Sequence, residues 1–572
     1  MRTRTQRTTA SILVLVFVFF VMSAACVAPA TPVPTTAPLP KVTQPVPAAV
    51  APEPTKPAPP ATVAPATVIK GGKLTLVLAI GEIKILDGQV WGSGESAMIS
   101  SWVADTLVGA DRDGKFKPYL ATEWQVSEDG KTWTFKLRKD VKFQDGTAFD
   151  AEAVKFNFDR IQDPKTQSLQ SAAMLGPVAT TEVMDAYTFK VTYKEPYPRF
   201  LDAISQGFFP MWSPTAVKKY GPDEFTRYLV GSGPFMLKEY KPGEKYVLVK
   251  NPDYNWAPAY MKHQGPAYLD EVTFRFIAEA ATAVSSLKNG EADIVMRFPE
   301  ANAPEFRNNP KYQVLDGTNT GSPVLLVMNT TKPPLNDLKV RQAMEHAINQ
   351  EDLVKAVMRG EADVTRGVMY PSSPCYWKDA EKVYPYDVKK AKALLEEAGW
   401  KLGADGIYEK EGKKLQFTVV LLSAYSPLGP VAQAQLKEIG ADAKIDLVPG
   451  AVQMERGAKG DFNMIFQHMT YSDPVVLDML YNSKNAKLGG WAWTGYVDPK
   501  LDDLLNKSSV TVDMAKRCEL LTEAQKIIAQ NALVLPMYGR KQLSIMTPRV
   551  KDFSFGPRAA VDVWLYNTYV EK

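Results

Sequence analysis

A proline-rich segment near the N-terminus of this chain of 572 residues separates a short leader from a long segment that can fold. From Cys26 to about Val68 the sequence consists mainly of Pro, Ala, Thr and Val and carries almost no charge. A stretch with so few large apolar residues cannot bury a core, and its prolines favour extended polyproline II backbone. Residues 26–68 are therefore predicted to be a disordered tether, and folding is left to the roughly 500 residues after it, enough for two or three domains.

The segment before the tether has the pattern of an export signal. Three arginines within the first seven residues precede an uncharged apolar run, 12–21, and small residues up to Ala25. The run is shorter than the roughly 20 residues that span a bilayer, so residues 1–25 are predicted to be a cleaved signal peptide. A small-residue cleavage site that ends at Cys26 resembles that of bacterial lipoproteins, in which the acylated cysteine anchors the protein. The alternative is a soluble secreted protein with an incidental cysteine.

Composition excludes several classes of protein. Without the three leader arginines the chain has 64 basic and 63 acidic side chains, so its charge gives no case for nucleic-acid binding. A second run of 18 apolar residues does not occur in the sequence. Cys375 and Cys518, the cysteines of the body, either pair in an exported protein or stay as two separate buried thiols.

Enzyme motifs are also missing from the sequence. A phosphate-binding loop ending at GKT, residues 130–132, is rejected because Gln125 stands where that loop needs glycine. Neither G-x-S-x-G nor H-E-x-x-H occurs, and the three histidines are far apart in the chain. We therefore expect no catalytic residues, no cofactor and no metal site.

The body alternates strand and helix signals. Polar and apolar residues alternate along KLTLVLAI, from Lys73, and along TWTFKLRKDVKF, where Trp133, Phe135 and Leu137 share one face; both are predicted strands. Asp150 is placed to cap a helix. Further helices are expected at 337–358, 387–398, 428–439 and 514–531, and strands at 415–422, 443–448 and 533–538. This alternation implies an α/β layer with crossover connections.

Several segments, in order, are similar to one family. They include YLATEWQVSEDGKTWTFKLRKDVKFQDGTAFDAEAVKFNFDR, GSGPFMLKEYKPGEKYVLVKNPDYN, LKNGEADIV, MNTTKPPLNDLKVRQAMEHAIN and LVLPMY. Together they resemble the cluster C solute-binding proteins of ABC importers, the extracellular receptors for peptides, nickel chelates and certain oligosaccharides. The resemblance spans roughly residues 70–560, and its strength lies in the number and order of the segments.

The resemblance implies a fold and a way of working. It predicts a two-lobed α/β fold of the type II periplasmic-binding-protein kind, in which the lobes close on a solute and present it to a permease. It places lobe I at 69–111, 229–315 and 525–572, an inserted domain at 112–228, and lobe II at 316–524. The protein is expected to be a monomer, lipid-anchored to the outer, periplasmic face of the cell membrane, with an ABC permease as partner.

The segment DFNMIFQHMT presents the first candidate ligand contacts. Family members that bind peptide termini usually carry an aspartate at the position of Thr470, where the carboxylate pairs with the ammonium of the ligand. Threonine cannot make that salt bridge, so Asp473 is the candidate substitute. His468 is a candidate contact for a ligand or a chelated metal.

Aromatic and glycine residues give the remaining candidates. Trp491 and Trp493 lie in a loop where the family places ligand contacts, and Trp91 follows the first strand. Flat rings suit sugar faces and apolar side chains equally. The competing interpretation is that both loop tryptophans belong to the core. Gly231 and Ser232 are expected where the chain crosses between lobes, because glycine tolerates the dihedral changes of closure.

The sequence therefore predicts an extracytoplasmic receptor of an ABC importer with a peptide or peptide-like ligand. An oligosaccharide receptor of the same fold is the main rival, supported by Thr470 and the tryptophans. A nickel-chelate receptor and a secreted hydrolase are the weaker alternatives.

Overall fold

The computed structural model describes residues 71–90, 93–486 and 490–571. The predicted signal peptide and tether, with Cys26, and the candidate Trp91 lie outside the described residues. The described residues form one compact unit with a mixed α/β fold. Among its described helices none combines the length and apolar character needed to cross a bilayer.

Lobe I, as we use the term, is built on a mixed seven-stranded sheet with the order β12-β21-β11-β1-β10-β9-β8. The strands are β1 (Lys73–Leu78), β8 (Phe235–Lys241), β9 (Lys245–Lys250), β10 (Glu271–Phe276), β11 (Ile294–Met296), β12 (Gln313–Gly317) and β21 (Gln542–Met546). β1 runs parallel to both of its neighbours, β10 and β11, and the other pairs are antiparallel. The helices α6 (Ala280–Lys288) and α7 (Pro304–Arg307) lie between β10 and β12 in the chain. The predicted strand at Lys73 is confirmed.

The inserted domain has its own antiparallel sheet, ordered β4-β5-β7-β6. Its elements are β4 (Ala121–Val126), β5 (Thr132–Leu137), β6 (Val178–Asp185), β7 (Thr188–Tyr193), α2 (Ala151–Gln162), α3 (Leu169–Leu175), α4 (Phe200–Ile204) and α5 (Pro214–Glu224). Trp133, Phe135 and Leu137 are all buried, as their shared face predicts. Asp150 accepts a hydrogen bond from the backbone N–H of Ala153 at 2.9 Å and caps α2.

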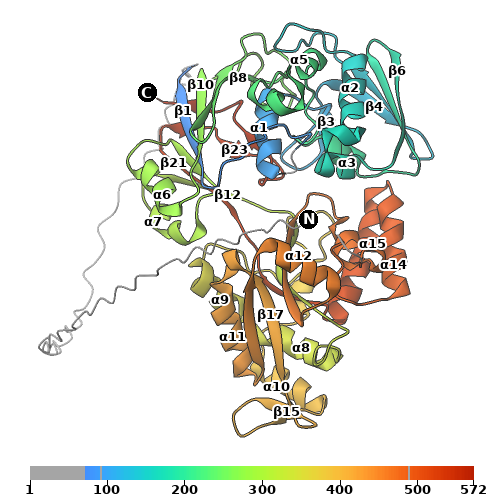
Figure 1. The fold of residues 1–572 in the computed structure, drawn as a ribbon, viewed down its shortest axis with the longest axis vertical. Helices are drawn as coiled ribbons and strands as arrows, with labels where there is room; N and C mark the ends of the chain where they lie inside the picture. The colour runs from blue at the N-terminus through green and yellow to red at the C-terminus, as the bar shows by residue number, and fades with distance from the viewer. Residues whose placement is uncertain (1–70, 91–92, 487–489, 572) are drawn as a thin grey trace, which may run out of the picture. The chain divides into compact units, whose positions relative to one another are not determined.

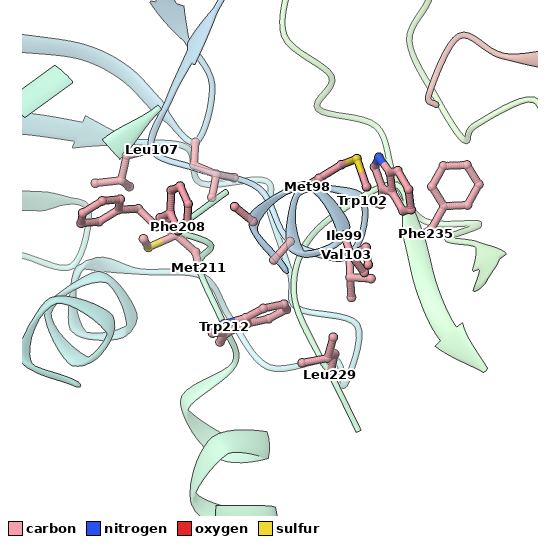
Figure 2. Close-up of a cluster of buried hydrophobic side chains, with 14 of the residues drawn as sticks. Met98, Ile99, Trp102, Val103, Leu107, Phe208, Met211, Trp212, Leu229 and Phe235 are labelled. Atoms are coloured by element: carbon pink, nitrogen blue, oxygen red, sulfur yellow. The ribbon is translucent and has the colours of Figure 1, made fainter. Parts of the chain in front are cut away.

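Helix α1 (Gly94–Val103) joins the inserted domain to lobe I. Met98, Ile99, Trp102 and Val103 have at most 2% of their surface exposed, so the helix is apolar on more than one side, as a buried helix should be. Figure 2 shows these side chains between Phe235 of lobe I and residues such as Phe208 and Trp212. The two parts therefore share one continuous hydrophobic core.

Lobe II is built on a five-stranded sheet with the order β18-β17-β19-β13-β20. Its strands are β13 (Gly321–Met328), β17 (Gln416–Leu422), β18 (Asp442–Val448), β19 (Met464–Thr470) and β20 (Val534–Tyr538). The helices are α8 (Leu338–Ala347), α9 (Gln350–Met358), α10 (Val388–Glu397), α11 (Leu428–Glu438), α12 (Gly450–Lys459), α13 (Val476–Tyr481), α14 (Pro499–Val510) and α15 (Met514–Gln530) (Figure 1).

Every residue of β13 is buried, so this strand, which lies between β19 and β20, has both faces covered. Val324, Leu326 and Met328 belong to the core formed with α8, α10 and α11, whereas Leu325 and Val327 face the core formed with α13, α14 and α15. The alternation of side chains along one strand thus separates two hydrophobic cores.

Two predicted elements differ from the observed ones, one by an interruption and one in its end. The helix predicted at 337–358 is two helices, α8 and α9, because Ile348 is extended and the Asn349 side chain accepts from the Asp352 N–H to cap the second. The strand predicted to run from Thr132 to residue 143 ends with β5 at Leu137.

Two short connections join the lobes. Residues 318–320 link β12 to β13, and residues 539–541 link β20 to β21. Asn319 ties them together, because its amide donates to the carbonyl of Arg540 at 2.7 Å and accepts from the Gln542 amide at 3.1 Å. The predicted return to lobe I at residue 525 is wrong, since β20 pairs with β13 and the chain stays in lobe II through Tyr538.

Candidate functional site

A cavity of about 500 Å³ lies between the lobes and is the main candidate site. Its wall combines the end of β19, residues of the two connections, the first turn of α1 and the stretch after α4. This size falls in the range of roughly 300–1,000 Å³ typical of small-molecule sites. Of the predicted contacts, His468, Thr470 and Trp491 line it.

His468 is held as a neutral group at the end of β19. Its Nε2 lies 3.1 Å from the hydroxyl of Tyr370. Burial, helped by the nearby charge of Arg540, lowers the pKa of His468 to about 3. The ring is therefore an uncharged hydrogen-bonding group at physiological pH. Among the described residues, His, Cys, Asp and Glu nowhere gather in a group of three that could hold a metal ion.

The two loop tryptophans have different environments. Their rings stack with centroids 5.2 Å apart and planes at 26°. Trp493 is 5% exposed, its indole N–H donates to the Gly490 carbonyl at 2.9 Å, and its ring presses on Gly457, where an added Cβ would come within 2.5 Å. Trp493 is a core residue, and Trp491 is the one of the pair that lines the cavity.

Asp473 is engaged in a buried ion pair. Its carboxylate receives two hydrogen bonds from the guanidinium of Arg517, one of them at 2.8 Å, and the side chains are 5% and 1% exposed. The Asp473 Oδ1 also accepts from the backbone N–H of Val475 at 2.7 Å. Asp473 borders a second cavity and does not line the main one, so the carboxylate is not placed to substitute for the aspartate missing at Thr470.

Gly231 and Ser232 lie where the inserted domain returns to lobe I, which corrects their expected position between the lobes. An added Cβ on Gly231 would come within 2.4 Å of the Ala104 side chain, so the glycine permits close packing on the end of α1. Ser232 donates to the buried carboxylate of Asp105 at 2.9 Å. Burial raises the pKa of Asp105 to about 6, although neighbouring side-chain donors such as the Trp256 indole oppose the shift.

Three arginines that the sequence reasoning missed line the cavity, and each is held by a carboxylate. The pairs are Arg297 with Glu95 at 2.8 Å, Arg540 with Glu300 at 2.8 Å, and Arg558 with Asp562 at 2.6 Å and Asp202 at 3.1 Å. Burial lowers the pKa of Arg297, and Glu95 opposes that shift. Fixed guanidiniums beside a neutral imidazole suit a ligand that carries carboxylates or other acceptors.

A sequence signal for two of these arginines existed. Arg297 directly follows β11, and Arg540 comes two residues after β20. Both strands are fully buried, and ligands of α/β folds bind beyond the carboxyl ends of strands. Arg558 lies in a stretch of irregular chain between short strands and has no such signal.

Cys375 and Cys518 form a disulfide, with Cα atoms 4.7 Å apart. This decides between the two states that the sequence left open. The bond ties α15 to the loop that contacts the first connection, since the hydroxyl of Ser372 donates to the carbonyl of Asn319. It lies within lobe II and joins no element across the cavity.

Two lobes joined by short connections around a cavity lined by arginines and an indole define a two-lobed solute-binding protein. The chain belongs to the bacterial extracellular solute-binding proteins, family 5, whose model matches residues 115–488. It is 32% identical over 461 residues to the glutathione-binding protein GsiB of Escherichia coli K12, covering 79% of this chain and 86% of that protein.

Solved structures agree with this assignment. DppA from Helicobacter pylori in complex with the peptide STSA is 27% identical, with a TM-score of 0.69 over 88% of this chain and 98% of that one. NikA from Brucella suis in complex with Fe(III)-EDTA is 24% identical, with a TM-score of 0.77 over 87% and 100% of the two chains, and supports the fold. The predicted two-lobed α/β fold and family are confirmed.

Proposed function

We propose that this protein captures a short peptide or peptide-like solute outside the cytoplasm and delivers it to the permease of an ABC importer. The observation that carries the proposal is the cavity between the lobes, with its fixed arginines, neutral His468 and the indole of Trp491. The family membership and a relative named for glutathione, itself a peptide with two carboxylates, support the same ligand class.

The charges of the cavity define how such a ligand binds. A ligand carboxylate pairs with Arg540 or Arg558, whose guanidiniums are already oriented by carboxylates behind them. Among the described residues, Glu95 is the carboxylate of the cavity wall, and Arg297 already pairs with it. Recognition therefore depends more on the ligand's acidic groups than on a free amino terminus.

A thermal-shift screen of the purified protein tests the ligand class. The panel contains glutathione, synthetic peptides of two to six residues, malto-oligosaccharides and nickel–histidine. A ligand at 100 times its dissociation constant stabilises the folded state by about 2.7 kcal/mol. Stabilisation by peptides, lost in Arg540→Gln and kept in the control Arg456→Gln outside the cavity, supports the proposal.

Other outcomes assign the protein differently. Stabilisation by an oligosaccharide alone, which stacking on Trp491 would favour, overturns the peptide assignment and keeps the receptor class. A bound ligand should be recovered with its mass unchanged and should reduce the radius of gyration in small-angle scattering as the lobes close. A chemically altered ligand would instead identify an enzyme.

Membrane attachment is part of the same proposal. The pattern of a signal peptide ending before Cys26, followed by a proline-rich tether, supports attachment of the receptor to the outer face of the cell membrane through an acylated cysteine. Cys26→Ser should release the protein from washed membranes into the soluble exported fraction. A variant that still pellets with membranes after high-salt washing would rule out this anchor.

A further inference from the structure

A second cavity, of about 360 Å³, lies beside the main one. Thr320, Ser472 and Arg558 line both cavities, so the two share a wall. Gln206 faces the main cavity and Asp202 faces the second. The shared wall is therefore about one side chain thick.

A closed set of hydrogen bonds holds this wall together. The hydroxyl of Ser472 donates to Asp202 Oδ2 at 2.7 Å and accepts from the Gln206 amide at 3.1 Å. The same amide donates to Asp202 Oδ2 at 2.9 Å. Arg558 completes the set by pairing with Asp202 Oδ1 at 3.1 Å. We call these four residues the partition.

The partition joins the two sides of the interlobe space. Asp202 lies in α4 of the inserted domain and Gln206 just after it, whereas Ser472 follows β19 of lobe II. Ser472 is the lobe II member of the partition, and its side chain is a single hydroxyl. Its contribution can thus be removed with little change to either core.

The second cavity is suited to a continuing peptide chain. Its wall offers apolar contact through Phe116, Pro198, Pro374 and Met514. Arg112 and Ser372 can bind the backbone or terminal groups of a peptide. An extended peptide advances roughly 3.3–3.6 Å per residue, so one or two added residues are enough to pass a wall one side chain thick.

We propose that the partition sets the length of the bound peptide, and that the second cavity is an extension subsite separated from the main cavity by these four residues. This inference rests on the proposed function, because it requires a peptide in the main cavity. A peptide that ends at the partition binds with the wall intact, and a longer one must break the Ser472 contacts.

Native mass spectrometry with synthetic peptide libraries of fixed length, from two to six residues, tests the proposal. The wild-type protein should retain peptides up to one length and bind the next length at least ten-fold less. Ser472→Gly and Gln206→Ala, each tested alone, should shift the limit upward by one or two residues. Ser472→Thr keeps the hydroxyl and adds bulk, so this matched control should keep the wild-type limit.

The outcomes separate the two proposals. Variants that melt like the wild type and bind short peptides with an unchanged length limit overturn the partition and leave the proposed function standing. A wild-type protein that binds all lengths equally overturns it as well. If peptides of no length bind, the proposed function fails and the partition falls with it.

Discussion

Replacing Asp473 distinguishes a ligand contact from a structural ion pair. Asp473→Ala leaves the guanidinium of Arg517 buried and unpaired, with 1% of its side chain exposed and with an Nε that already has no hydrogen-bond partner among the described residues. Removing one partner of a buried pair costs about 3–5 kcal/mol of unfolding free energy. We therefore expect a large loss of stability in urea unfolding and no specific loss of binding to peptides with a free amino group.

The double replacement Asp473→Asn with Arg517→Met is the matched comparison. Asparagine still accepts the hydrogen bond from the Val475 N–H, and methionine fills part of the arginine's volume without its charge. Because exchange of a buried ion pair for uncharged groups is often close to neutral, much of the stability should return. The reasoning is refuted if Asp473→Ala unfolds like the wild type yet binds free-amine peptides ten-fold more weakly than the wild type does, with its affinity for acetylated peptides unchanged.

Three further predictions concern the cavity and the buried carboxylate. Trp491→Ala should weaken peptide binding by about 1–4 kcal/mol in calorimetry at an unchanged melting temperature, whereas Trp493→Ala should cost about 3–5 kcal/mol of stability; the reverse pattern contradicts the assignment. Because the pKa of His468 is about 3, this ring should not change charge near pH 6.5. Peptide affinity measured across that pH should therefore follow the same curve in the wild type and in His468→Asn. The folded state keeps the Asp105 proton up to about pH 6, whereas the unfolded chain loses it near 3.8. The free energy of unfolding should therefore fall by ~3 kcal/mol as pH rises through that window, and Asp105→Asn should abolish this component.

Strongly periodic segments were predictable from sequence. The apolar stripe after Asp387 forms α10, and the Asp387 side chain caps this helix by accepting a hydrogen bond from the backbone N–H of Lys390. The alternating run that begins at Lys73 forms β1. The split between α8 and α9 was less visible, because Asn349 caps a helix from within a stretch of continuous helical pattern. Local preference and tertiary packing compete at such a position, and the pattern alone does not decide between them.

The site was predictable only in part, because its members come from distant segments. The end of β19 indicated His468 and Thr470 by resemblance, and both line the cavity. Trp491 and Trp493 are identical residues two positions apart in one short loop. The sequence pattern therefore could not show which of them packs against Gly457. The Asp473 carboxylate pairs with Arg517, which lies 44 residues later in the chain, so this contact forms only on folding and is not visible in the local sequence.

The side chain of Asn319 limits how the lobes can move. Two connections of three residues each are joined through this one amide, which is 2% exposed. Sliding of one lobe past the other would break both of its hydrogen bonds, whereas rotation about an axis through Asn319 keeps them. This cross-link between the connections therefore favours rotation about that axis over other relative motions of the lobes. Few conformations are then lost when a solute is captured, so little of the contact energy is spent on reorganising the protein.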